Sequence, residues 1–400
     1  MDFKSRTSVV SAAALLVIVF AFAHWLVQSS ARAEAQGGRA TAPTIYGEYA
    51  DRQQYSPLTQ INTANVRNLQ VAWTYDLGQR GKSFQATPIV VGATMYFPTP
   101  DSKVVALDAM TGKELWQYDP VLKYTRVSRG VAYWPGGPNT PPRILFGTAD
   151  GRLLALDTKT GQPIPGFGEK GEVNVRAMAL QGFPNSSFWF TSPPSMLRDQ
   201  VIIAPALQEA PVRGATGNGD PRAFDVLTGK QTWQAHTMPR AGEPGVDSWG
   251  AEGTVDRSGP SAWVPIAVDT ARNMAFVTTG NPPGGAPYGK NLHTNSIVAL
   301  EGKTGKILWY FQMVHHDIWD FDSVDSAIIE LHRDGRTIPA IAALNKSGSL
   351  FILNELTGEP LFDIVERPVP QASEGAEPAW PTQPFPSAPP SVTLNAMTEA

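Results

Sequence analysis

The chain has 400 residues, of which 42% are hydrophobic and 17% charged, a composition typical of a folded globular protein rather than a disordered one. Its net charge of −4 provides no basic field for a nucleic acid, which excludes that class of partner. The absence of cysteine excludes disulfides, thiolate chemistry, Cys-type zinc sites and a covalently attached c-type haem.

A targeting segment opens the chain. Basic residues precede an apolar run from about Val9 to Val27, and Ala31-Arg32-Ala33 has the small-x-small form of a cleavage site. We predict a signal peptide or an N-terminal membrane anchor over residues 1–33, followed by a linker over 34–45. The body of the chain is therefore expected to be periplasmic, secreted or anchored to the inner membrane.

One phrase then recurs along the chain. An apolar strand ends in Asp, Glu or Asn, Thr-Gly makes a tight turn, and a new strand begins, usually with an aromatic residue. Glycine supplies the positive φ that such a turn requires. The copies are ALDAMTGKELW (106–116), ALDTKTGQPIP (155–165), AFDVLTGKQTW (223–233), ALEGKTGKILW (299–309) and FILNELTGEPLF (351–362).

The repeat predicts an all-β fold, a β-propeller of four-stranded blades. Its units recur about every 50 residues, with insertions, and each corresponds to one supersecondary unit. Trp116, Trp233 and Trp309 are expected to wedge between neighbouring blades with their N–H groups bonded to backbone, which is a structural role. At these intervals the chain has room for about five or six blades.

The phrase, together with HHDIWDFD (315–322), resembles the quinoprotein dehydrogenases. That resemblance implies an eight-bladed propeller that binds pyrroloquinoline quinone (PQQ) and a divalent metal, here over residues 46–400. Because eight blades need a longer chain, we expect the sequence to be incomplete at its C-terminus. Further segments match the family in order: DRQQYSPLTQINTANVRNLQVAWTYDLG (51–78), SRGVAYWPGG (128–137), FTSPPSML (190–197), SAWVPIAVD (261–269), TTGNPP (278–283) and ALNKSGSLFILNELTG (343–358).

The resemblance implies that Asp320 is the catalytic base, delivered by the strand after Trp309, although an Asp there could instead cap a turn. Glu209 and Asn281 match metal ligands, with Asp320 and Asp322 as further oxygen donors. Such hard donors suit Ca²⁺, with Mg²⁺ or a lanthanide as alternatives. The plainer interpretations are a solvated loop charge for Glu209 and a turn residue for Asn281.

The resemblance also implies the residues that bind the cofactor. Trp263 would form the floor under the quinone ring, and Lys346 would bond the quinone oxygens. Arg129 and Thr191 would bind the PQQ carboxylates and carbonyls, and Gln85 is a further candidate. Without their flanking motifs, Trp263 would be interpreted as another wedge and Lys346 as a surface charge.

Other residues near these motifs remain open or depart from the pattern. His315 and His316 are adjacent on an expected strand and so point to opposite faces, which argues against a shared metal. His316 could orient Asp320 or meet substrate, whereas His315 could pack or bond backbone. Trp319 is either a wall of the substrate entrance or core packing. Trp134 stands where membrane glucose dehydrogenases of the family carry a His.

Two functions follow as alternatives. The first is a periplasmic oxidoreductase that transfers a hydride from the CH–OH group of an aldose or alcohol to PQQ, with a separate ubiquinone or cytochrome as electron acceptor. The second is a non-catalytic propeller scaffold that binds proteins of the cell envelope. The repeat phrase occurs in both, so only the candidate site distinguishes them.

Overall fold

The computed structural model of the protein describes residues 45–46, 50–56, 58–78, 83–181, 185–207, 219–250, 259–282, 286, 288–371 and 376–393. The expected targeting segment lies outside these residues, and so does the expected linker apart from its last position. In the described part of the chain, no helix is long and apolar enough to cross a membrane.

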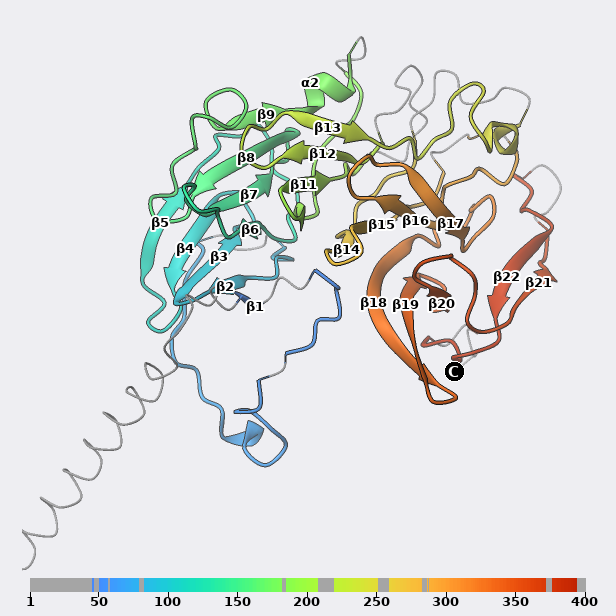
Figure 1. The fold of residues 1–400 in the computed structure, drawn as a ribbon, viewed down its shortest axis with the longest axis horizontal. Coiled ribbons are helices and arrows are strands. Elements are labelled where there is room, and N and C mark those ends of the chain that lie inside the picture. The colour runs from blue at the N-terminus through green and yellow to red at the C-terminus, as the bar shows by residue number, and fades with distance from the viewer. Residues whose placement is uncertain are drawn as a thin grey trace, which may run out of the picture. The chain divides into compact units, whose positions relative to one another are not determined.

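Six antiparallel sheets follow one another along the described chain (Figure 1). Sheet 1 contains β1 (Ile45–Tyr46), β2 (Ile89–Val91), β3 (Thr94–Pro98), β4 (Val104–Asp108) and β5 (Glu114–Tyr118). Sheet 2 contains β6 (Ala132–Trp134), β7 (Arg143–Gly147), β8 (Arg152–Asp157) and β9 (Glu172–Asn174). Sheet 3 contains β10 (Ser195–Leu197), β11 (Gln200–Ile203), β12 (Arg222–Asp225) and β13 (Gln231–Gln234).

The last three sheets complete the described architecture. Sheet 4 contains β14 (Ala267–Asp269), β15 (Met274–Thr278), β16 (Ser296–Glu301) and β17 (Ile307–Gln312). Sheet 5 contains β18 (Ser323–Arg333), β19 (Arg336–Asn345) and β20 (Leu350–Asn354), and sheet 6 contains β21 (Ile364–Pro368) and β22 (Thr382–Pro386). Helical structure in the described residues is limited to α2 (Val175–Ala179) and the 3-10 helices η1 (Val66–Asn68) and η2 (Val246–Trp249).

The sheets are arranged as the blades of a propeller (Figure 1). The first strands of successive sheets lie against one another, β6 with β10, β10 with β14, and β14 with β18. The later strands of each sheet lead outward from this row, which is the radial order of propeller blades. The expected all-β propeller, with about five or six blades in this chain, is confirmed.

The hydrophobic core lies in layers between the faces of adjacent sheets. One cluster joins sheets 1 and 2 through side chains such as Tyr96 and Phe146, and another joins sheets 4 and 5 through Phe276 and Phe351. Phe146, Phe276 and Phe351 are fully buried. Apolar side chains of adjacent sheets are therefore buried against one another.

Three tryptophans of the recurrent phrase dock onto a neighbouring sheet in the same way. Each indole N–H donates to the backbone carbonyl that follows the Asp, Glu or Asn of the next copy, which confirms the expected structural role. The pairs are Trp116 with Thr158 at 2.9 Å, Trp233 with Gly302 at 2.8 Å, and Trp309 with Glu355 at 3.0 Å.

The glycine of the Thr-Gly turn is required for two reasons. At Gly305 and Gly358 the φ angles are +72° and +74°, which favour glycine. A Cβ on Gly358 would also lie 2.6 Å from the ring of Trp309, and a Cβ on Gly305 would lie 2.5 Å from the ring of Trp233. The turn of one blade is thus the surface on which the tryptophan of the preceding blade packs.

Two copies of the phrase lack the tryptophan and carry a proline two residues after the glycine. Pro163 and Pro360 each make only an isolated bridge, to Leu156 and Leu353. Proline has no N–H to donate to a ladder, so the expected strand does not form directly after these turns. Among the described residues, sheet 5 accordingly has no fourth strand beside β20.

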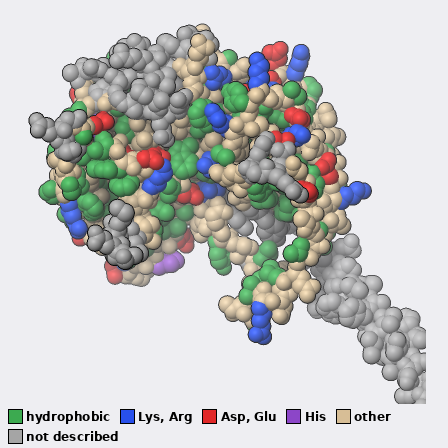
Figure 2. Space-filling model, turned by 180° about the vertical axis from the view of Figure 1, so that it is seen from behind, with side chains coloured by type: hydrophobic (Ala, Val, Ile, Leu, Met, Phe, Trp, Pro, Cys, Tyr) green, Lys and Arg blue, Asp and Glu red, His purple; other side chains and the backbone are tan. Residues whose placement is uncertain are grey.

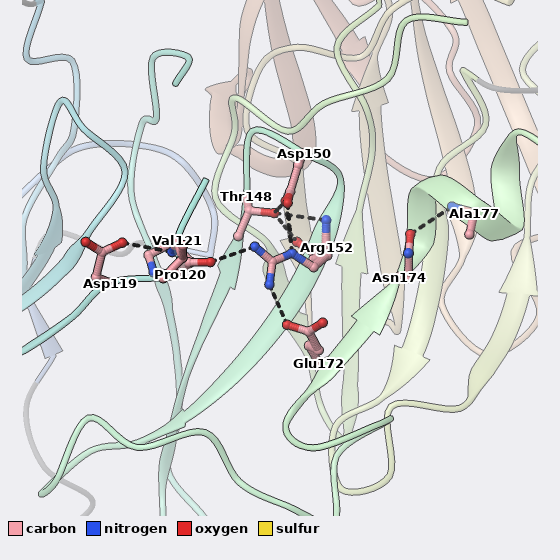
Figure 3. Close-up of polar contacts among 9 residues, drawn as sticks. All are labelled: Asp119, Pro120, Val121, Thr148, Asp150, Arg152, Glu172, Asn174 and Ala177. Carbon is pink, nitrogen blue, oxygen red and sulfur yellow. Dashed lines mark hydrogen bonds and ion pairs between the residues drawn. The ribbon is translucent and has the colours of Figure 1, made fainter. Parts of the chain in front are cut away.

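Polar contacts join β8 to its surroundings on sheet 2 (Figure 3). Arg152 binds Asp150 and the Glu172 carboxylate of β9, and it donates to the Pro120 carbonyl at 2.8 Å. At the last residue of β9, the side chain of Asn174 accepts from the backbone N–H of Ala177 and caps α2. These contacts connect the end of sheet 1 with the outer strand of sheet 2.

The surface seen from behind carries no segregated charge. Basic and acidic side chains lie interspersed among apolar ones on this face (Figure 2). This mixture agrees with a chain that has 32 basic and 36 acidic residues.

Candidate functional site

The stretch MVHHDIWDFD forms the loop between β17 and β18. β17 ends at Gln312 and β18 begins at Ser323. His316 and Asp320 adopt positive φ angles of 43° and 64°, so the chain turns sharply at both. The expectation that a strand delivers Asp320 is therefore wrong, because the side chain of Asp317 binds backbone N–H groups of this segment and stabilises a loop instead.

Strand pairing brings Lys346 to Asp322. Ser323 and Asn345 are directly opposed in the antiparallel pair β18–β19, so the residues that flank them are neighbours. The backbone N–H of Lys346 donates to the Asp322 carbonyl at 2.9 Å. Its ammonium Nζ lies 2.8 Å from Asp322 Oδ2 and 2.9 Å from Asp320 Oδ2. One cation therefore bridges two carboxylates that belong to the same loop.

The electrostatics of this bridge favour a charged lysine. Burial by itself would lower the pKa of Lys346, but its hydrogen bonds to Asp320 and Asp322 outweigh this and raise the pKa. The Asp320 side chain is 56% exposed, whereas that of Asp322 is only 2% exposed. Asp320 is thus the carboxylate that an incoming molecule can reach.

Asp322 connects the loop to Asn281. Its Oδ1 accepts the backbone N–H of Asn281 at 2.7 Å, while its Oδ2 binds Lys346. A Cβ on Gly280 would lie 2.7 Å from the same Oδ1, so only glycine fits beside it. Asp322 holds Asn281 and Lys346 in place, and its use as a metal ligand stays a prediction.

Two cationic side chains lie near the ring of Trp263. The guanidinium carbon of Arg129 is 5.0 Å from the centre of its ring, and Nζ of Lys346 is 5.8 Å from it. The backbone carbonyl of Trp263 accepts from Thr191 Oγ1 at 3.2 Å and from Ser192 Oγ, which ties this segment to the one before β10. Burial lowers the pKa of Arg129.

A cavity of about 200 Å³ lies beside Trp263 and Arg129, and Gln85 also lines it. Arg52 and Asp325 close the same cavity and form an ion pair at 3.3 Å. Arg52 was not expected here from the sequence, because nothing in the pattern of 51–78 distinguishes it. Of the remaining candidates, Glu209 lies outside the described residues.

The two histidines of the loop contact different partners. His315 binds the side chains of Gln312 at 2.8 Å and Glu366 at 3.0 Å. His316 binds the side chain of Asn291 at 2.6 Å and lies 3.3 Å from Glu377. Burial lowers the pKa of both rings.

The two open tryptophans also have defined surroundings. Trp319 stacks on Phe321 with ring centres 5.6 Å apart and lines a largely apolar cavity of about 260 Å³. Trp134 is buried in β6, with the guanidinium of Arg143 5.1 Å from its ring centre. Trp319 is therefore a cavity wall, and Trp134 has a packing role.

The contacts around Trp263, Lys346 and Asp322 therefore connect candidates from six separate segments. A family model described as the PQQ "Glucose/ethanol/alcohol dehydrogenase, beta-propeller domain" matches residues 44–400. The chain belongs to this family of PQQ dehydrogenases. The expected resemblance is thereby confirmed.

Individual PQQ dehydrogenases agree with the family match. The quinoprotein glucose dehydrogenase A of Acinetobacter calcoaceticus is 33% identical over 362 residues, which cover 82% of this chain and 44% of that protein. The quinohemoprotein alcohol dehydrogenase of Comamonas testosteroni has a solved structure that is 30% identical, with a TM-score of 0.67, over 84% of this chain and 50% of that one.

A third relative contains a metal. The structure of a europium-containing methanol dehydrogenase is 25% identical, with a TM-score of 0.63, over 81% of this chain and 59% of that one. This chain thus spans about half the length of the PQQ dehydrogenases that it matches.

The residues brought together fit the cofactor of this family. A planar quinone that bears carboxylates requires a flat apolar surface with cations nearby. The Trp263 ring, with Arg129 and Lys346 close to it, supplies these elements. Asn281 and Asp320 carry the side-chain oxygen atoms that are expected as metal ligands. Among the described residues no three acidic or histidine side chains converge as metal ligands, so the ligand set stays a prediction.

Proposed function

We propose that this chain is the propeller part of a PQQ-dependent dehydrogenase that oxidises the CH–OH group of an aldose or an alcohol. The observation that carries the proposal is the Lys346 ammonium, which binds Asp320 at 2.9 Å and Asp322 at 2.8 Å and lies 5.8 Å from the Trp263 ring centre. A scaffold protein has no evident need for an exposed carboxylate held by a cation next to an aromatic face.

The residues of the site would divide the work as follows. When bound, PQQ supplies an o-quinone that accepts a hydride from the substrate carbon. Trp263 would support the flat ring, and Arg129 would bind a carboxylate of the cofactor. Asp320 would accept the hydroxyl proton at its exposed carboxylate, with Lys346 fixing the position of that carboxylate.

A metal ion and its ligands belong to the same proposal. Asn281 and Asp320, with Glu209 from outside the described residues, would hold Ca²⁺, Mg²⁺ or a lanthanide through oxygen atoms. Asp322 would act mainly by holding Asn281. Electrons would then pass to ubiquinone or a cytochrome, and the segment 1–33 would direct the chain to the periplasm or anchor it to the inner membrane.

The test is reconstitution of the full-length protein with PQQ and either Ca²⁺ or Mg²⁺. We expect metal-dependent quenching of tryptophan fluorescence on PQQ binding, and dye-linked oxidation of glucose or a simple alcohol. If PQQ does not bind with either metal, the enzyme proposal is wrong and the scaffold alternative takes its place.

A further inference from the structure

Asp320, which carries the exposed carboxylate, has an unusual backbone conformation that neighbouring contacts must stabilise. Its φ of +64° is a conformation that L-residues with side chains rarely adopt. Such a conformation persists only where the surroundings hold it. The contacts that fix the chain on either side of Asp320 therefore help to determine where this carboxylate points.

Asp317 provides these contacts from inside the loop. Its side chain is buried, and its Oδ1 accepts the backbone N–H of Trp319 at 2.9 Å, while its Oδ2 accepts that of Phe321 at 2.7 Å. The two N–H groups belong to the residues immediately before and after Asp320. One carboxylate thus clamps the chain on both sides of the proposed base.

Asn295 ties this clamp to the rest of the site. Its side-chain amide donates to Asp317 Oδ2 at 2.7 Å. Its backbone N–H donates to the Gly280 carbonyl at 2.8 Å, and its carbonyl accepts the N–H of Met313 at the start of the loop. Because Gly280 precedes Asn281, the clamp fixes the loop relative to a predicted metal ligand.

The carboxyl group of Asp317 is both buried and hydrogen-bonded. Burial raises the pKa of the carboxyl group, and the hydrogen bonds from Trp319, Asn295 and Phe321 oppose that shift. Both carboxyl oxygens already accept N–H donors of the protein, so Asp317 acts through these contacts.

We propose that Asp317 is a positioning residue, whose buried carboxylate holds the peptide N–H groups around Asp320 and thereby sets the direction of the catalytic base. This inference rests on the proposed function, because the direction of Asp320 matters only if Asp320 takes the proton. It assigns separate roles to the three acids of HHDIWDFD: Asp317 positions the base, Asp320 is the base, and Asp322 holds Asn281 and Lys346.

The test is Asp317→Asn, with Asp334→Asn as the control for loss of one negative charge at the exposed β18–β19 hairpin tip. An asparagine presents an N–H₂ group to donors that need an acceptor, so the clamp is disrupted. We expect kcat to fall about 10- to 100-fold, as for a misplaced catalytic group. The affinity for PQQ should change by less than about threefold, because Asp317 is not expected to contact the cofactor. The pH profile of kcat/KM should shift.

A second measurement and a milder variant keep the test valid if Asp317→Asn is poorly folded. Asn295→Gly removes the amide donor without strain at a φ of +46°, and should give a smaller loss in kcat. Hydrogen exchange of the Trp319 and Phe321 amides should accelerate in Asp317→Asn and stay unchanged in Asp334→Asn.

The outcomes separate the two proposals. The positioning role is overturned if Asp317→Asn has the same kcat, pH profile and amide exchange as the wild type while Asp320→Asn is inactive. The proposed function would then remain intact. A wild-type chain that binds PQQ and has no more activity than Asp320→Asn overturns both. Loss of kcat with retained PQQ affinity and faster exchange supports the positioning role.

Discussion

The Thr-Gly turns of the recurrent phrase and the loop 313–322 both contain residues with positive φ, but different contacts stabilise them. The turns repeat one local arrangement, in which the tryptophan of the preceding blade packs against a glycine with positive φ. The loop is unique, and its positive φ occurs at His316 and Asp320, where no glycine relieves the strain. Repetition thus stabilises the scaffold, whereas the candidate site occurs where the repeat is interrupted.

This contrast predicts that substitutions in the loop affect chemistry and substitutions in the turns affect stability. The largest effect should come from Asp320→Asn, which removes the proposed base. We expect turnover to fall about 10²- to 10⁴-fold, the usual contribution of a general base. Steady-state dye-linked assays would measure it, with PQQ affinity and unfolding free energy close to wild type.

The matched control for that experiment is Asp334→Asn, which removes an equivalent charge on the exposed hairpin tip and should retain full turnover. Turnover by Asp320→Asn at the wild-type rate would mean that another group accepts the proton. The prediction that substitutions in the loop affect chemistry would then be wrong.

The next largest effect is expected for Gly358→Ala in a Thr-Gly turn. The added Cβ would lie 2.6 Å from the Trp309 ring, and the residue would also be strained at a φ of +74°. Strain of about 1 kcal/mol and overpacking of about 2 kcal/mol should lower the unfolding free energy by about 3 kcal/mol. Denaturant unfolding followed by tryptophan fluorescence would measure this.

Gly335→Ala provides the control, because Gly335 has nearly the same φ, +70°, and a Cβ added there would have no atom within 4 Å. Only the strain of about 1 kcal/mol should remain in this variant. Equal destabilisation of the two variants would show that the tryptophan contact adds nothing to the turn.

A smaller loss is expected for Trp309→Phe. The phenylalanine keeps an aromatic ring but loses the indole N–H, so the carbonyl of Glu355 has no donor from this side chain. The lost hydrogen bond and the reduced packing should together cost about 2 kcal/mol in unfolding free energy. Tyr310→Phe, at a half-exposed neighbour on β17, should change stability by less than about 0.5 kcal/mol.

The smallest effect depends on pH and concerns Glu355, which is buried between sheets 4 and 5. Burial, and then the neighbouring Asp269, raise its pKa to about 7 from an ordinary 4.5, while Arg272 opposes the shift. The folded state therefore holds the proton more tightly than the unfolded state. This stabilisation is complete below pH 4.5 and is lost as the pH rises towards 7 and above.

Glu355→Gln should accordingly be more stable than wild type at pH 8, by about 1 kcal/mol after allowance for partial solvation, and equal to it near pH 5. Chemical unfolding at the two pH values would measure the difference. The exposed Glu359→Gln should show no such pH dependence, and an identical profile for both variants would contradict the burial argument.

The recurrent phrase alone was sufficient for the fold. Thr-Gly after a strand-ending Asp predicted the hairpins, and the tryptophans were placed correctly because their packing partner is the same local turn in the next copy. The strands after Pro163 and Pro360 were expected wrongly, although the missing N–H of proline was visible in the sequence.

The sequence by itself determined which residue types meet, because each repeat carries its own turn, strand and docking side chain. Only the tertiary structure decided how the site is built. Asn295 and Lys346 come from segments outside the loop. Their contacts with its three acidic residues depend on the pairing of β18 with β19 and on the path of the chain after Gly280. Such long-range contacts do not recur at a fixed spacing in the sequence, so no sequence pattern predicts them.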